Sequence, residues 1–208
     1  MADNIAITAG SGTTIAADDI GGVKHQRVKL SVGADGEATD LDFGQAAMAA
    51  SVPVVPASDI DTVITVTPTL DTNAYASGDL LFDSTEVASA ARANGAVVTL
   101  VSVTIVDKAD QKVAFTLLIA NAATDFGALN GAPDPDDSEA ATAIGWLPVG
   151  TGDYVDLGGA AVACVRNVNL VLKAGAATTS LYIAAVNGSG APTYGASDLV
   201  FYLGFRRG

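Results

Sequence analysis

Short apolar runs separated by turn-forming residues recur along most of this chain, and they predict β-strands. From about residue 60 onward they come at regular spacing, with Gly, Asn, Asp or Pro between them. The runs cover residues 62–68, 79–82, 96–107, 113–120, 145–149, 153–157, 161–165, 167–173, 180–186 and 198–205. Many short strands with almost no helix indicate an all-β fold, and we expect an antiparallel, jelly-roll-like β-sandwich.

Two of these runs, 96–107 and 198–205, are apolar on both faces for much of their length. We therefore expect them to lie centrally in a sheet or to face a neighbouring subunit. The run 113–120 follows 96–107 across a polar turn at 108–111, which predicts a hairpin. The best helix candidate is 131–145, with an Asp near 134–137 as its cap, Glu139 in its first turn and Gly145 at its end.

Residues 1–59 have a different character, and we predict an extended N-terminal arm there, followed by the sandwich domain over 60–208. Pro53 and Pro56 disfavour helix and central sheet, so residues 51–59 read as a linker or strap. We expect Asp18, Asp19, Gly21 and Gly22 to form a turn before the next strand.

The stretch GGVKHQRVKLSVGADG, residues 21–36, holds three of the ten Lys and Arg residues and the single His. Its alternation predicts a strand with an apolar face and a basic face. The apolar face would carry Val28, Leu30 and Val32, and the other His25, Arg27, Lys29 and Ser31. We expect a strand of this kind to pack between two protein surfaces.

Composition narrows the classes of function. The chain has 208 residues and a formal net charge of -13, which argues against nucleic-acid binding. No apolar run approaches about 18 residues, so we expect no transmembrane helix and no membrane partner. The N-terminus lacks the pattern of a secretory signal. One cysteine, Cys164, allows no disulfide within the chain.

The sequence offers no catalytic constellation, and we expect no enzymatic activity, no cofactor and no metal. Cys164 lies in the apolar run AVACV, which favours a small buried core residue. His25 stands between basic neighbours, as a surface or interface histidine would. Two acidic clusters lack the spacing of an EF-hand and are expected to be a solvated turn and a helix cap. They comprise Asp35, Glu37, Asp40 and Asp42, and Asp134, Asp136, Asp137 and Glu139.

The segment DDIGGVKHQRVKLSVGADG, residues 18–36, is similar to a known type of protein segment. An acidic-Gly turn, a basic QRVKL strand and a Gly/Asp turn together resemble a segment near the start of many tailed-bacteriophage virion proteins. The runs 64–82 and 97–111 are similar to a group of phage structural proteins. The resemblance covers roughly the first half of the chain and is looser beyond residue 120. It implies a virion component without enzymatic activity.

Together these observations lead us to expect a capsid decoration (cement) protein on the exterior of the virion, a homotrimer assembled in the host cytoplasm. Its partners would be the major capsid protein and neighbouring copies of itself. The expected contact residues are Lys24, His25, Arg27, Val28, Lys29 and Leu30. The alternatives are a tail, fibre or baseplate protein that binds host glycans, a virion enzyme and a major coat protein. A glycan platform would use Trp146, Tyr154, Tyr182, Tyr194 and Tyr202.

Overall fold

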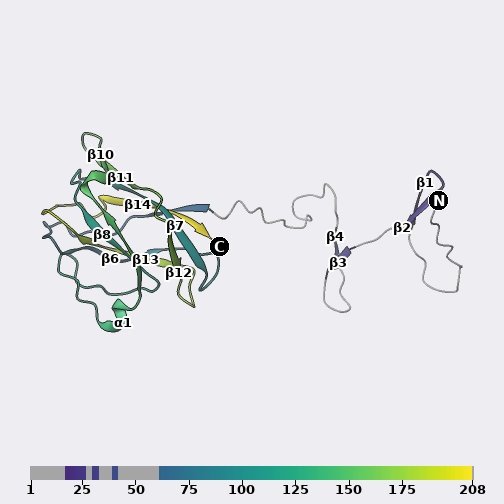
Figure 1. Cartoon of the computed structure of the whole chain (residues 1–208), viewed down its shortest axis with the longest axis horizontal. Coiled ribbons are helices and arrows are strands. Elements are labelled where there is room, and N and C mark those ends of the chain that lie inside the picture. Colours follow the sequence, from purple (N-terminus) through teal and green to yellow (C-terminus); the bar gives the residue numbers. More distant parts are fainter. Residues whose placement is uncertain (1–16, 27–29, 33–38, 42–60, 208) are drawn as a thin grey trace. The chain divides into compact units, whose positions relative to one another are not determined.

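The computed structural model of the chain describes residues 17–26, 30–32, 39–41 and 61–207. The chain divides into two compact units, residues 1–55 and 56–208 (Figure 1). Each unit is treated by itself below. The arm and the sandwich were predicted over 1–59 and 60–208, and the predicted strap at 51–59 lies outside the described residues.

The described part of the first unit consists of two short antiparallel pairs. β1 (Ala17–Ile20) pairs with β2 (Val23–Gln26), and β3 (Leu30–Val32) pairs with β4 (Thr39–Leu41). Gly21 and Gly22 form the two-residue turn of the first pair, with φ of 63° and 86°. Both values lie in the left-handed region, where glycine is favoured and where two-residue hairpin turns need it. Because Asp18 and Asp19 belong to β1, the predicted turn was wrong by those two residues.

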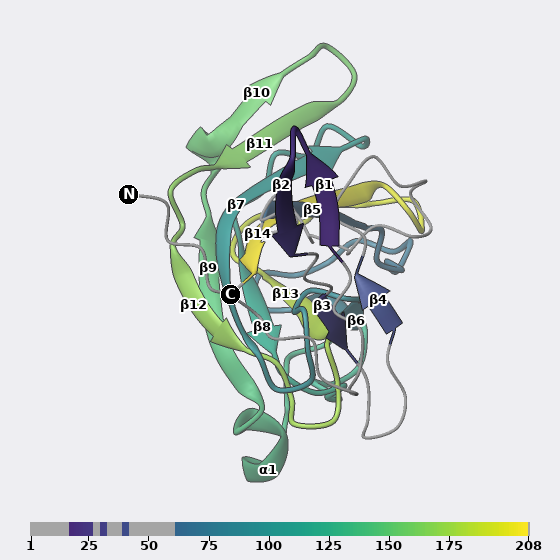
Figure 2. The same ribbon diagram turned by 90° about the vertical axis from the view of Figure 1, so that its right-hand side faces the viewer.

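The second unit is an antiparallel β-sandwich, which confirms the predicted fold class (Figures 1 and 2). One sheet, called the long sheet here, has the order β10-β11-β7-β14-β5, and β12 also pairs with β7. The other, the short sheet, has the order β6-β13-β8-β9. The strands of the long sheet are β5 (Asp61–Val66), β7 (Val97–Asp107), β10 (Tyr154–Asp156), β11 (Ala161–Val165), β12 (Leu170–Lys173) and β14 (Leu199–Arg207). Those of the short sheet are β6 (Leu80–Val87), β8 (Phe115–Ala120), β9 (Ala143–Val149) and β13 (Leu181–Asn187).

The two apolar strands predicted to be central are central. β7 lies between β14 on one side and β11 and β12 on the other, and β14 lies between β7 and β5. Each therefore has strand neighbours along both edges, which satisfies its backbone hydrogen bonds within the sheet. Figure 2 shows β11 and β12 following one another along the same edge of β7.

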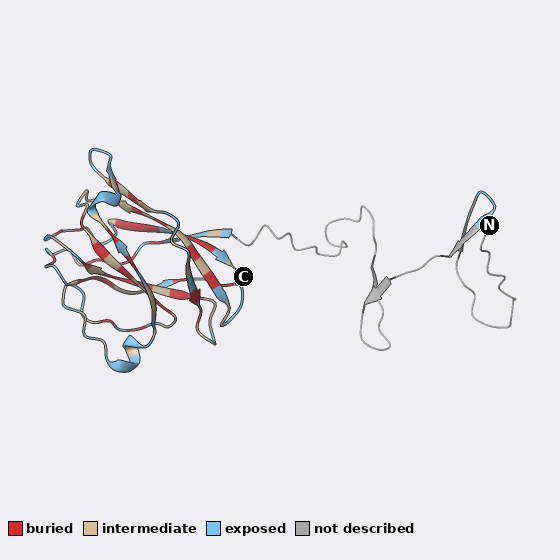
Figure 3. Cartoon of the chain, in the orientation of Figure 1, coloured by how far each residue is buried: buried red, intermediate tan, exposed pale blue. Residues whose placement is uncertain are grey.

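The core lies between the two sheets, where the inward side chains of both meet (Figure 3). Phe201 of the long sheet contacts two phenylalanines of the short sheet edge-on, with ring centroids 5.3 Å from Phe82 and 6.1 Å from Phe115. All three rings are buried. Edge-to-face pairs at this separation add to the gain from burying the rings, so these contacts join the sheets at the centre of the core.

The hairpin predicted from 96–107 and 113–120 was wrong, because β7 and β8 belong to different sheets. Asp107 is fully buried at the end of β7, where its carboxylate accepts from the amides of Ala109 (3.1 Å) and Lys112 (2.8 Å). Asp110 and Lys112 take left-handed φ of 56° and 51°. This turn leads the chain across the sandwich. Burial raises the pKa of Asp107, while the amide donors of Lys112 and Ala109 favour the charged carboxylate.

The predicted helix exists but is shorter than expected. α1 (Asp137–Ala140) begins with a capping box, in which Asp136 accepts from the Glu139 amide and Glu139 accepts from the Asp136 amide. The proposed end at Gly145 was wrong, since Gly145 lies within β9. A Cβ there would meet Leu170 Cδ2 at 2.9 Å, so this glycine allows close packing between strands.

The Phe201 contacts give a test of the core. We expect Phe201→Ala to lower the free energy of unfolding by about 3–5 kcal/mol, because it removes a buried ring and leaves a cavity. Trp146→Ala is the matched control, since Trp146 is 63% exposed, and its effect should stay near 0.5 kcal/mol. Urea unfolding followed by circular dichroism measures both. Equal losses in the two variants would contradict this account of the core.

Candidate interaction surface

The structure places the N-terminal residues that were predicted to make contacts in two different strands and outside the described residues. Lys24 and His25 lie in β2, where the register places them opposite Asp19 and Asp18. Leu30 begins β3, a separate strand. The remaining three, Arg27, Val28 and Lys29, lie outside the described residues. Two of the basic residues thus have an acidic residue as their cross-strand neighbour, a pairing the alternation argument did not use.

A second candidate surface is the outward side of the long sheet, which we call the valine face. Its side chains alternate along each strand with those that enter the core. Its members are Val63, Thr65, Val97, Thr99, Val101, Ser102, Thr104, Val106, Val155, Val162, Cys164, Val171, Val200, Tyr202 and Gly204. Apart from Asp61, Lys173 and Arg206, near the end where β7 begins, the outward positions of these strands are uncharged, in a chain whose net charge is -13.

Strand register arranges the valine face in rows. Val155 pairs with Val162, Val162 with Val106, and Val106 with Val200, which makes a row of valines across four strands. The next row runs from Cys164 through Thr104 and Tyr202 to Thr65. β-branched side chains suit such positions because they pack against cross-strand neighbours.

Several side chains of the valine face are open to solvent. Val63 and Val171 are each 66% exposed, Val155 is 63% exposed and Tyr202 is 39% exposed. Single exposed apolar residues are ordinary, but a contiguous group of this kind on one sheet is typical of a surface that binds another protein. This surface was partly predictable, since the run 96–107 is apolar on both faces.

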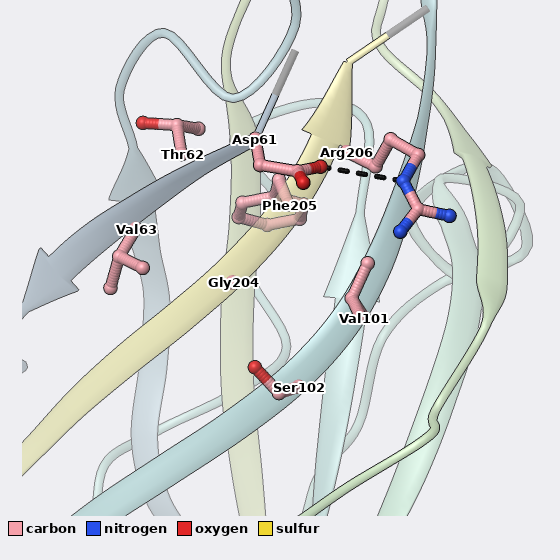
Figure 4. Close-up of a pocket in the computed structure, with 8 residues that line it drawn as sticks. All are labelled: Asp61, Thr62, Val63, Val101, Ser102, Gly204, Phe205 and Arg206. Carbon is pink, nitrogen blue, oxygen red and sulfur yellow. Dashed lines mark hydrogen bonds and ion pairs between the residues drawn. The ribbon is translucent and has the colours of Figure 1, made fainter. Parts of the chain in front are cut away.

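A hollow of about 280 Å³ lies on the valine face between β5, β7 and β14 (Figure 4). Its floor is Gly204, flanked by Val63, Val101 and Ser102. The register of β14 on β7 shifts after Gly204, which leaves Val101 as an extra residue in β7. A Cβ on Gly204 would lie 2.5 Å from Ser102 Oγ, so the glycine and the bulge together create the hollow.

Charged side chains lie at the two ends of the valine face. At the end where β7 begins, Arg206 Nε lies 3.3 Å from Asp61 Oδ1, and Lys173 ends β12. Both partners of this ion pair are exposed, so it contributes little to stability. At the end where β7 stops, Lys112 Nζ lies 3.0 Å from Asp110 and 2.8 Å from Asp156. The hydrogen bond from Lys112 lowers the pKa of Asp156.

Cys164 was expected in the core, and this was wrong. It is half-buried on the valine face, where the Thr104 hydroxyl lies 3.6 Å from its sulfur. The core positions of β11 are Ala161 and Ala163 instead. Hydrogen bonds from Thr104 and Arg166 hold the pKa of the Cys164 thiol below its usual value. An apolar run of five residues cannot reveal which of its two faces enters the core.

The aromatic residues considered for a glycan platform do not share one surface. Tyr194 is buried edge-on against Tyr75, with ring centroids 6.2 Å apart. Burial raises the pKa of Tyr75, to about 12. Trp146 is exposed on the short sheet, whereas Tyr202 belongs to the long sheet. The remaining two, Tyr154 and Tyr182, are half-buried.

The second acidic cluster acts locally as a helix cap. Asp136 Oδ1 accepts from Ser138 Oγ at 2.7 Å and from the Glu139 amide at 2.8 Å, and these bonds lower its pKa. Among the described residues, no three His, Cys, Asp or Glu side chains are grouped as metal ligands would be. Of the helices in the described part of the chain, none has the length and apolar character needed to cross a membrane.

Comparison with protein-family models and with curated proteins finds no match. Among solved structures, one of infectious bursal disease virus, Gx strain, is 14% identical over 86% of this chain, with a TM-score of 0.28. The chain spans only 36% of the length of that protein. A structure of Desmodium yellow mottle tymovirus is 13% identical over 86% of this chain and 93% of that one, with a TM-score of 0.26. TM-scores this low do not establish a shared fold.

The surroundings of Cys164 predict its reactivity. Thr104→Val and Arg166→Gln should each move the midpoint of the pH–rate profile for iodoacetamide alkylation to higher pH, because each removes a hydrogen bond that favours the thiolate. The chain has one cysteine, so the measured rate belongs to Cys164 alone. An unchanged midpoint in both variants would show that neither side chain stabilises the thiolate.

Proposed function

We propose that this chain is a structural protein of a tailed-bacteriophage particle, and more specifically a capsid decoration protein that bridges coat subunits. The observation that carries the proposal is the valine face, a broad uncharged surface on an otherwise acidic β-sandwich. Such a surface suits protein–protein contact. The resemblance of residues 18–36 to phage virion segments supports the same role.

The proposed role is mechanical and involves no catalysis. Decoration proteins gain strength from many identical weak contacts, since each linked contact raises the effective concentration of the next. An arm of residues 1–59 would contact the shell or a neighbouring copy, with Lys24, His25, Arg27 and Lys29 meeting acidic groups there. The homotrimer expected on the capsid exterior stays a prediction for the copies bound to the particle.

The second candidate is a tail or fibre protein that binds a host glycan. Trp146, 63% exposed on β9, is the observation that favours it, because exposed aromatic rings stack on sugars. Copy number separates the two roles. Quantitative mass spectrometry of purified particles should find on the order of hundreds of copies for a decoration protein and only a few for a tail protein.

Arm docking has a direct test with particles that lack this protein. Deletion of residues 1–36 should abolish binding to them, and Arg27→Glu should weaken binding about tenfold or more, because a basic contact becomes repulsive. Arg92→Glu is the matched control, since it changes the net charge equally on an exposed loop of the sandwich. Undiminished binding by the deletion variant, with its sandwich still folded, would exclude docking through the arm.

A further inference from the structure

The valine face approaches the extent of a standard protein interface. Its six strands contain 38 residues in all. At about 3.3 Å per residue and about 4.8 Å between strands, they cover about 600 Å². Two such faces together would bury about 1,200 Å², the lower end of the range for specific, stable interfaces.

Charge restricts what can cover this face. A second copy of a chain with net charge -13 is repelled at most orientations. The valine face itself carries no charge over its central rows, so two copies can approach there without burying an unpaired ion. A surface that fits the valine face is flat, uncharged and rich in β-branched side chains. A second valine face has these properties.

The charged residues at the two ends of the valine face favour one orientation of the second copy. Lys173 and the Arg206–Asp61 ion pair lie at one end, where these three residues carry a net positive charge. At the other end, Lys112 with Asp110 and Asp156 carries a net negative charge. A two-fold axis along the strands would place Lys173 and Arg206 opposite their own copies. An axis across the strands places the basic end of one copy against the acidic end of the other, which is favourable.

The hollow supplies a place for a protruding side chain. Tyr202 stands on β14 two residues before Gly204 and is 39% exposed. The hollow at Gly204, about 280 Å³, exceeds the roughly 150 Å³ cavity that accommodates a benzene ring. Because a two-fold axis repeats every contact, the Tyr202 of each copy can enter the hollow of the other.

We propose that a second copy of this chain docks on the valine face, related by a two-fold axis across the strands, with each Tyr202 in the Gly204 hollow of the other copy. This pairing concerns the isolated protein and does not need a virus particle. The pairing rests on the same face as the proposed decoration role and is proposed for the free protein in solution. A monomer that still binds particles would overturn the pairing alone, and a dimer that does not bind particles would overturn the decoration role alone.

Sedimentation equilibrium of the full chain, up to about 100 µM at physiological salt, tests the proposal. We expect a dimer. Val63→Lys and Tyr202→Lys should each raise its Kd at least 100-fold, because they place a charge within the contact. Tyr202→Phe should keep the dimer, since the ring remains. Trp146→Lys is the matched control on the short sheet and should also keep it. Thermal unfolding verifies that every variant is folded.

A further readout separates this interface from others. Cys164 lies on the valine face, so its alkylation should slow at least tenfold as the protein concentration rises through the dimer Kd. A monomer throughout, a trimer, a dimer that survives both lysine variants, or a dimer lost in Trp146→Lys would each overturn the proposal.

Discussion

The packing of Phe201 between Phe82 and Phe115 is the contact on which the sandwich depends. It joins the central strand β14 of the long sheet to the short sheet, and all three rings exclude water. Once these rings face inward, the alternation of the strand is settled along its length. Val200, Tyr202 and Gly204 must then face outward, and the register of neighbouring strands extends the same choice across the sheet.

The valine face is thus a consequence of the core. A strand buried on one side normally carries polar residues on the other, as half-exposed antiparallel sheets do. Here the outward positions of β7 and β14 are instead valine, threonine, serine, glycine and one tyrosine, with one charged residue, Arg206, near the end. A surface of this composition lowers solubility unless something covers it, and the acidic charge of the rest of the chain opposes unspecific association. Both features suit a protein that associates at one defined surface.

Fewer residues of the basic N-terminal segment are good candidates for docking contacts than the sequence indicated. Lys24 and His25 lie across the first hairpin from Asp19 and Asp18, so part of the positive charge has an acidic neighbour within the same unit. Substitution of Lys24 or His25 would therefore change the first hairpin as well as any docking contact. In the proposed role, the arm would attach through charge and the valine face through apolar contact.

The fold class, the approximate positions of the strands and the cap of the short helix were predictable from the amino-acid sequence, because they depend on local alternation and on turn residues. Tertiary structure decided the rest. The turn after Asp107 leads to β8 in the opposite sheet, and the Asp107 carboxylate accepts hydrogen bonds from two amides of that turn. The outward position of Cys164 also depends on the tertiary structure. A run that is apolar at every position can place either face in the core, and pairing with β7 determines which face enters it. The hollow at Gly204 depends on the register shift between β7 and β14. These strands are distant in the sequence, so the alternation within either one does not predict the shift.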